Sequence, residues 1–400
     1  MSNIHAALEI GTTRTILAIG ESDDGGRLKV TCHAEIPSTG VRKSQILDIK
    51  QATQSIRSVL HEIERKQDES DTKITIGNAI LATSGQHIRA DRAEGSVQVD
   101  GIKVGQIDID EVEQRAREMP LAKGRELLDI VDQDYELDNL SGISSPRGMA
   151  GRILKLNTLH IHADANRIQD AKSAAEDAHL EIKESIFATT CAAEAVLEDH
   201  EKKNGVLVLD IGGGSTGYAA YSDGYLVSAG VVGVGGDHIT NDIAHAFQTT
   251  NAQAEQLKTE ESSATLGRYT TENSRVRIVG SSALMESRTI SRKALDTVVS
   301  ARVKELFTII RETLEENDLL HRLHSGAVLT GGGASLEEIE RVAEFELGMN
   351  VRKGRPIHVD GLENEKDPWS FAAIAGALMY SHRNYEEKPI LGGIFGRFFK

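Results

Sequence analysis

Apolar and polar positions follow two different periods along the chain, one typical of buried strands and the other of amphipathic helices. Residues 206–209 form an apolar run that ends in Asp210 and three glycines. An unbroken apolar run of this kind is typical of a buried central strand. Two further strands are predicted over residues 218–221 and 225–229, joined by a turn at 222–224. The stretch therefore predicts a strand, a glycine turn and a hairpin.

The same order of residue types occurs near the start of the chain. Apolar residues 6–8 lead into Glu9 and then into a glycine and two threonines at positions 11–13. Strands are predicted again over residues 16–20 and 28–31, on either side of an acidic glycine turn. Two such units, half a chain apart, suggest a duplicated domain.

The chemistry of both units suits phosphate binding. Glycines at the end of a strand let the backbone turn sharply and approach a ligand, and their N–H groups can hold phosphate oxygens. Glu9 and Asp210 supply the carboxylates that Mg²⁺ prefers, and hydroxyls follow each glycine turn. Two such halves facing each other would clasp a nucleotide triphosphate from both sides. One glycine turn alone is a weak signal, and two unrelated tight turns are the alternative.

Helical and strand-like periods divide the remaining chain. Helices are predicted over residues 46–63, 164–180, 187–197, 239–247, 252–258, 299–314 and 369–380. Further strands are predicted over residues 74–76, 79–82, 181–186 and 276–280. The helices 187–197 and 369–380 are rich in small residues, which allow close backbone packing.

Residues 79–163 change in character and are interpreted as a small α+β insertion. Strands are predicted around residues 96–99, 126–134 and 153–162, with a helix over 107–119. His160 and His162 lie two residues apart on one predicted strand and could bind a metal ion. A solvated or partly buried pair without a third ligand is the favoured interpretation.

A third glycine turn follows the apolar residues 327–329, without an acid at the strand end. Such a surface suits contact with adenosine better than metal binding. Ser335 with Glu338 fits a capping box that opens the next helix. Gly235 and Gly236 end another glycine-rich connection, just before the helix 239–247.

Composition narrows the choice of partners. The formal net charge of −16 argues against a nucleic-acid partner. Cys32 and Cys191, the two cysteines, fit a reducing cytosol and structural burial. The first residues lack the pattern of a signal peptide, and no apolar run approaches the ~20 residues of a membrane span. Any membrane contact is therefore expected to be peripheral.

The C-terminal tail suggests such a contact. Leu391, Ile394, Phe395 and Phe398 share one face of a predicted helix. Three glycines cost about 1 kcal/mol each in a helix, so the tail is expected to fold only at a lipid interface. Nearby cations would add attraction to anionic lipid. Docking of the tail on the protein's own core is the alternative.

The glycine turns and small-residue helices together resemble the actin/Hsp70/sugar-kinase ATPase superfamily. The matching segments are residues 9–15, 188–197, 210–216, 330–335 and 372–380. Within it, the chain is similar to the bacterial FtsA cell-division family over nearly its whole length. Segments 8–12, 133–138, 142–151, 210–214, 242–247 and 328–332 carry this likeness. The departures are a very short linker before the C-terminus and the polar segment 259–275.

The resemblance implies an α/β fold, an actin-like ATPase with two duplicated RNase H-like halves around a nucleotide cleft. An inserted α+β subdomain of the 1C type would complete it. The implied boundaries are 1–78 and 164–203 for subdomain 1A, 79–163 for 1C, 204–235 and 325–380 for 2A, 236–324 for 2B, and 381–400 for the linker and membrane-targeting helix.

The likeness also implies a site for ATP or ADP with Mg²⁺. Glu9 and Asp210 would hold Mg²⁺ through water, and Glu255 and Lys258 match family positions near the purine and ribose. Glu194 would orient an attacking water, with a surface glutamate as the alternative. The other implied nucleotide contacts are Gly11, Thr12, Thr13, Gly212, Gly213, Gly214, Ser215, Thr216, Gly235, Gly236, Gly331, Gly332, Gly333 and Ala334.

The implied function is that of a filament-forming cell-division protein with at most weak ATPase activity. It would polymerise at the cytoplasmic face of the inner membrane, at the division site, tether FtsZ and recruit later divisome proteins through 1C. The implied contacts with anionic lipid are Leu391, Ile394, Phe395, Arg397, Phe398, Phe399 and Lys400. The acidic FtsZ tail peptide would meet a basic cluster of Arg288, Arg292, Lys293 and Arg302, for which a plain solvated face is the alternative.

Two other functional classes share this superfamily. A PilM-like adaptor of type IV pilus assembly has the same core and a similar insertion, but the amphipathic tail argues against it. A sugar or acetate kinase would need a catalytic acid facing a substrate cleft, and the sequence offers no clear candidate.

Overall fold

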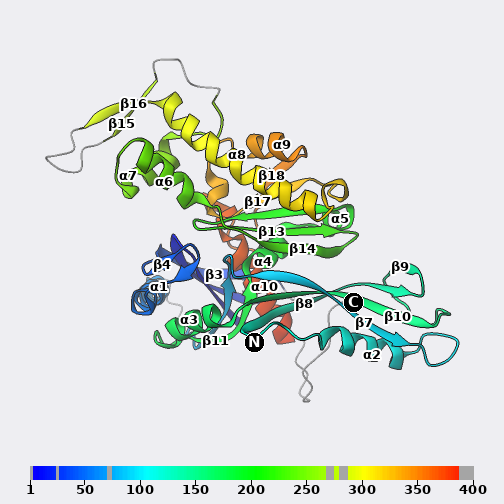
Figure 1. Cartoon of the computed structure of the whole chain (residues 1–400). Coiled ribbons are helices and arrows are strands. Elements are labelled where there is room, and N and C mark those ends of the chain that lie inside the picture. Colours follow the sequence, from blue (N-terminus) through cyan, green and yellow to red (C-terminus); the bar gives the residue numbers. More distant parts are fainter. Residues whose placement is uncertain (1–2, 24–26, 70–73, 267–273, 279–286, 387–400) are drawn as a thin grey trace.

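The computed structural model describes residues 3–23, 27–69, 74–266, 274–278 and 287–386. Two halves stack one above the other, with a third unit extending sideways from the lower half and a fourth above the upper half (Figure 1). A cavity lined by residues of both halves lies between them.

The first half is built on a five-stranded sheet of order β11-β6-β1-β2-β3. Its strands are β1 (Asn3–Ile10), β2 (Arg14–Ser22), β3 (Leu28–Pro37), β6 (Asn78–Thr83) and β11 (Glu181–Phe187). The first three are antiparallel, whereas β6 and β11 add in parallel. Helices α1 (Ile49–Glu69) and α3 (Ala165–Glu176) belong to this half, and Asp164 caps α3 through the N–H groups of Asn166 and Arg167.

The second half repeats this topology. Its sheet has the order β14-β13-β12-β17-β18, again an antiparallel meander followed by two parallel strands. The strands are β12 (Val206–Ile211), β13 (Thr216–Ser222), β14 (Tyr225–Val232), β17 (Ala327–Thr330) and β18 (Val351–Lys353). Residues 206–209 are fully buried in the middle of this sheet, as their apolar run predicts. The predicted duplication is confirmed.

The insertion forms its own four-stranded sheet of order β7-β10-β8-β9. It comprises β7 (Arg89–Gln98), α2 (Gln106–Arg117), β8 (Arg125–Leu137), β9 (Leu140–Ile143) and β10 (Ile153–Asp164). Helix α2 packs so closely on β7 that a Cβ at Gly95 would lie 2.4 Å from the carbonyl oxygen of Val112. The expected start at residue 79 is too early, since β6 pairs with β1 and β11 of the first half.

The unit above the second half is mostly helical. It contains α6 (Gly236–Ala246), α7 (Asn251–Gln256), β15 (Arg275–Ile278), β16 (Arg288–Ser291) and α8 (Arg292–Glu316). The apolar face predicted for residues 299–314 is buried in the hydrophobic core shared with the second sheet.

Two local predictions are wrong. Residues 74–76, predicted as a strand, have no regular secondary structure, although Ile74 and Ile76 pack against the hydrophobic core of the first half. Ser335 does not open the next helix, because α9 (Ile339–Leu347) begins after Glu338, whose carboxylate accepts from Thr265.

Two small-residue helices connect the halves, as Figure 1 shows at the centre of the molecule. They are α4 (Ala188–Val196) and α10 (Ala372–Glu386). A Cβ at Gly376 would lie only 1.8 Å from the carbonyl oxygen of Cys191. The helices therefore touch through their backbones, which only glycine permits at this position. Short helix α5 (Asp199–Asn204) then leads into the second sheet.

Candidate functional site

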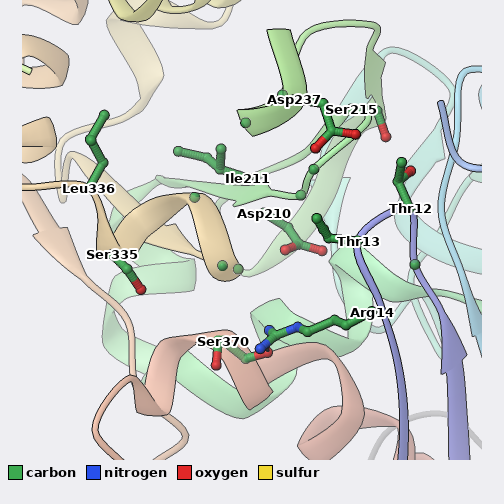
Figure 2. A pocket seen from close by; sticks show the side chains of 18 of the residues that line it. Thr12, Thr13, Arg14, Asp210, Ile211, Ser215, Asp237, Ser335, Leu336 and Ser370 are labelled. Atoms are coloured by element: carbon green, nitrogen blue, oxygen red, sulfur yellow. Dashed lines mark hydrogen bonds between the residues drawn. The ribbon is translucent and has the colours of Figure 1, made fainter. Parts of the chain in front are cut away.

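The cavity between the halves has a volume of about 690 Å³ and is lined by the strand ends of both sheets. Figure 2 shows Thr12 and Thr13 of the first half facing Asp210 and Ser215 of the second across this space. Ser335 and Leu336 lie at another side, and Ser370 lies below. The cavity thus brings together segments that are far apart in the sequence.

The two glycine turns have the same hydrogen-bond geometry. The N–H of Gly11 donates to the carbonyl of Arg14 at 2.9 Å, and the N–H of Gly212 donates to the carbonyl of Ser215 at 2.9 Å. Both turns follow the central strand of their sheet, β1 or β12. We call the turns at residues 11–14 and 212–215 the first and second phosphate loops. The matching turns show that the duplication extends to the site itself.

The two loops touch each other. A Cβ at Gly213 would lie 2.5 Å from Thr13 Oγ1, and one at Gly214 would lie 2.5 Å from Thr12 Oγ1. Glycine is therefore required where the second loop approaches the threonines of the first. Gly213 lines the cavity, whereas Gly214, also predicted as a nucleotide contact, does not.

Helix α6 begins on the second phosphate loop. The N–H groups of Gly236 and Asp237 donate to the carbonyls of Gly212 and Gly213 at 2.9 and 2.8 Å. Gly235 and Gly236, two of the predicted nucleotide contacts, both line the cavity. The start of α6, with its partial positive charge, therefore faces the cavity, which favours an anionic ligand. Burial raises the pKa of Asp237 at this position.

Glu9 and Asp210 occupy equivalent places at the ends of β1 and β12, and both line the cavity. Burial, followed by repulsion from Asp210, raises the pKa of Glu9 to about 7. Burial raises the pKa of Asp210 to about 6, although Arg14 lowers it. Two carboxylates that resist ionisation because they are desolvated and close together form a site that a cation would stabilise.

Arg14 is a site residue that the sequence analysis missed. Its guanidinium donates to Glu35 Oε2 at 2.7 Å and to the carbonyl oxygen of Ser370 at 2.8 Å. Its positive charge lowers the pKa of both cavity carboxylates, against the larger effect of burial. The sequence offered one signal for this role, because Arg14 directly follows the two threonines of the first loop.

The third glycine turn, at the end of β17, forms another wall of the cavity beside Asp210. Gly331, Gly332 and Gly333 line it, whereas Ala334 is fully buried beneath them. Gly331 has a φ of +78°, and a Cβ there would lie 2.4 Å from Asp210 Oδ1. Leu336 adds an apolar wall.

Glu255 and Lys258 also line the cavity, where they form an ion pair of 2.7 Å. Lys258 Nζ further donates to Thr240 Oγ1 at 2.9 Å and to the carbonyl of Gly236 at 3.3 Å. This network ties α7 and its continuation to α6 beside the second phosphate loop. Thr216, predicted as a direct contact, is buried and donates to the carbonyl of Val234 at 2.7 Å, so it supports the loop instead.

Glu194 is not brought to the cavity. Its carboxylate pairs with Lys202 at 2.7 Å and with Arg383 at 3.4 Å, on the side of α4 that faces α5 and α10. Burial alone would raise the pKa of Glu194, but Lys202 and Arg383 outweigh it and hold the pKa below its usual value. The water-orienting role predicted for Glu194 is therefore wrong for this conformation, and the side chain instead ties the two connecting helices together.

Of the four predicted FtsZ-contact residues, Arg302 lies apart from the other three, which are at or beside the start of α8. Arg288 donates to the carbonyl of Phe247, and Arg292 is paired with Glu261. Arg302 binds Asp242 through two hydrogen bonds of 2.6 and 3.0 Å and lines the cavity. Lys293 is exposed at the start of α8. Pairing with Asp242, which sequence spacing does not reveal, therefore separates Arg302 from the other three cations.

The histidine pair of the insertion is held by protein groups. His160 Nε2 lies 3.0 Å from the carbonyl of Ala116, and His162 contacts Arg125 and Asp91, both at 2.8 Å. Across the described ranges, no group of three or more His, Cys, Asp or Glu side chains could hold a metal ion.

The predicted lipid contacts, from Leu391 to Lys400, lie outside the described residues. Among the helices that the structure describes, none has the length and apolar character to span a membrane.

Comparison with known proteins identifies the family. A family model described as "Cell division protein FtsA" matches residues 207–376, and another described as "SHS2 domain inserted in FTSA" matches residues 85–162. Cell division protein FtsA of Pseudomonas aeruginosa is 31% identical over 379 residues, which cover 93% of this chain and 88% of that protein. The chain belongs to the FtsA family. FtsA of Escherichia coli K12 is 28% identical over 389 residues, covering 95% of this chain and 91% of that protein.

Solved structures share the fold of this FtsA-family chain. A chain of the PilM-PilN type IV pilus biogenesis complex superposes with a TM-score of 0.62 at 17% identity, covering 96% of this chain and 99% of that chain. MreB 5 of Spiroplasma citri bound to AMPPNP superposes with a TM-score of 0.53 at 15% identity, covering 96% and 97%. At these identities the likeness establishes the actin-like fold alone. The predicted fold and the predicted FtsA family are both confirmed.

Proposed function

We propose that this protein binds ATP with Mg²⁺ in the cavity between its halves. One observation carries the proposal, namely the pair of phosphate loops with identical turns that meet at Thr12, Thr13, Gly213 and Gly214. Backbone N–H groups and hydroxyls from both sides suit the β- and γ-phosphates. The turn at 331–333 and the Glu255–Lys258 pair suit the adenosine.

Glu9 and Asp210 would hold Mg²⁺, through bound water. Their raised pKa values fit this role, because a cation between them relieves the repulsion that disfavours ionisation. When bound, Mg²⁺ would neutralise charge on the phosphates. Arg14 would lower the pKa of both carboxylates, so that they release their protons more readily when the cation binds.

The cell-division role would be that of a membrane tether for FtsZ. Support comes from membership of the FtsA family and from the amphipathic pattern of the C-terminal residues. Closure of the two halves around the nucleotide would control self-assembly, and many tails on one polymer would make weak lipid binding firm. The protein would then act at the cytoplasmic face of the inner membrane at the division site, where the 1C-type insertion would recruit later division proteins.

The acidic tail peptide of FtsZ would bind the unit that contains α8. Arg288 and Arg292 contribute to its positive charge from within their contacts, and exposed Lys293 stands beside them. Arg275 and Arg277 add two further exposed cations on β15. Arg302 belongs with the nucleotide cavity in this proposal.

The test of nucleotide binding is Gly213→Asp, measured by calorimetric titration of ATP in the presence of Mg²⁺. The new side chain would meet Thr13 Oγ1 and Asp237 Oδ1, and its charge would face the phosphates. The control is Gly77→Asp, which adds the same charge where a Cβ meets nothing within 4 Å. We expect tight binding by the wild type and the control, and loss of binding by Gly213→Asp. Equal ATP affinity of all three proteins would refute the site.

A further inference from the structure

Ser44 bridges the two phosphate loops, although it belongs to neither. It lies at the turn between β4 (Val41–Arg42) and β5 (Gln45–Ile46). Its backbone N–H donates to Thr12 Oγ1 at 2.8 Å, and its hydroxyl lies 3.0 Å from Ser215 Oγ. One residue thus connects a threonine of the first loop with a serine of the second, across the boundary between the halves.

The backbone at this turn has an uncommon conformation. Lys43 and Ser44 have φ values of +50° and +57°, in the left-handed region that disfavours side chains with a Cβ. A two-residue hairpin turn of this kind usually contains Asn and Gly. Contacts with both phosphate loops hold Ser44 in a conformation that glycine would adopt more readily. Strain of this kind is concentrated at functional sites.

The tip of the hairpin lies directly against the second phosphate loop. A Cβ at Gly214 would be 2.8 Å from the Cα of Lys43 and 2.9 Å from the nitrogen of Ser44. Ser44 also lines the cavity, and its hydroxyl lies 3.4 Å from Thr12 Oγ1. Hydroxyls from three separate segments therefore converge where the loops meet, with Ser44 between the other two.

We propose that Ser44 is a nucleotide-binding residue that recognises the terminal phosphate of ATP. The inference rests on the proposed ATP-binding function and adds a residue outside the glycine turns. A γ-phosphate between the loops would offer Ser44 a charged acceptor, which a hydroxyl prefers to the neutral hydroxyls that it contacts otherwise. ADP lacks this phosphate, so Ser44 would keep its contacts with Thr12 and Ser215.

This role has a consequence for domain closure. Ser44 joins the halves through neutral hydrogen bonds in the absence of the phosphate and through the phosphate in its presence. The hairpin is attached to the first half, where Leu47 N–H donates to the carbonyl of Gly40 at 2.7 Å just before α1. ATP would therefore draw the hairpin and the second loop together more strongly than ADP does.

The test compares the affinities of Ser44→Ala and Ser44→Gly for ATP and for ADP, measured by titration calorimetry with Mg²⁺ on the full chain. Both variants lack the hydroxyl, and we expect each to lose about tenfold in ATP affinity with ADP affinity within about twofold of the wild type. Ser44→Gly should also melt at a higher temperature than Ser44→Ala, because glycine adopts the left-handed conformation without strain. The ligand effect is then separated from the backbone effect.

Thr39→Ala is the matched control for loss of a hydroxyl. Thr39 lies in the same segment, but its hydroxyl contacts Ser55 Oγ at 3.0 Å and the carbonyl of Gln51 at 3.1 Å. We expect it to leave the ratio of ATP to ADP affinity unchanged. A wild-type ratio in both Ser44 variants would overturn the inference and leave the ATP site standing. A wild type that binds neither nucleotide would overturn the proposed function, and this inference with it.

Discussion

Glu9→Gln should stabilise the nucleotide-free protein and yet prevent it from gaining stability from Mg·ATP. The substitution keeps the size of the side chain and removes the charge that burial and Asp210 disfavour. A carboxyl whose pKa is raised from 4.5 to about 7 lowers the free energy of unfolding by about 3 kcal/mol at a pH well above 7.

The sign of the effect follows from proton binding. Below pH 4.5 the carboxyl is protonated in both the folded and the unfolded protein, so the substitution changes little. Between pH 4.5 and 7 the folded state binds more protons than the unfolded state, so wild-type stability falls as the pH rises. The stabilising effect of Glu9→Gln should therefore be small at pH 4.5 and greatest above pH 7.

The assay is thermal unfolding at pH 5, 6, 7 and 8, with and without Mg·ATP. Without ligand, we expect Glu9→Gln to melt a few degrees above the wild type at pH 8 and close to it at pH 5. With Mg·ATP, the wild type should gain stability and the variant should not. Glu312→Gln, which removes an exposed carboxylate on α8, is the control. A variant that melts below the wild type at pH 8 without ligand would refute the electrostatic reasoning.

Three further predictions concern the cavity charges, the connecting helices and the acid pair. Arg14→Gln removes the cation that lowers the pKa of Glu9 and Asp210. Mg²⁺-dependent ATP binding should therefore weaken at pH 7 and recover in part at pH 8.5, where the two carboxyls lose their protons. An unchanged pH profile of ATP binding would count against this role of Arg14. Gly376→Ala places a Cβ 1.8 Å from a carbonyl oxygen of α4 and should lower the free energy of unfolding by about 2 kcal/mol or more. The control Gly77→Ala adds a Cβ in open space and should cost far less. Equal melting temperatures of the two variants would contradict the close packing of α4 and α10. For the wild type, Mg·ATP affinity should fall as the pH drops from 8 to 6, because the cation must displace protons from Glu9 and Asp210. Titration calorimetry in buffers of different ionisation enthalpy would detect the released protons. A pH-independent affinity without proton release would be inconsistent with a carboxylate metal site.

The two halves could be predicted from the sequence because each contains the same local order of residue types. An apolar strand, an acid, a glycine and hydroxyls recur in the same order, and the structure gives both copies the same turn. The apolar face of α8 was equally visible, since its residues recur at helical spacing. These signals depend on neighbours within a few positions of the chain.

The missed or misplaced residues depend on long-range packing. Ser44 meets Ser215 across the cavity, and nothing near Ser44 in the sequence indicates that contact. The rotation of α4 directs Glu194 to Lys202 and Arg383, which spacing relative to Asp210 could not reveal. Arg302 was grouped with cations of β16 and the start of α8, but it pairs with Asp242 of α6 and lines the cavity.

Cosedimentation of purified FtsZ with anionic liposomes, in the presence of Mg·ATP, tests the proposed tether most directly. Three proteins should be compared, namely the full chain, a chain ending at Glu386, and the full chain with Gly213→Asp. We expect FtsZ in the pellet with the full chain and in the supernatant with the shortened one, and reduced pelleting with Gly213→Asp if ATP promotes assembly. FtsZ that stays in solution although the full chain binds the liposomes would contradict the tether.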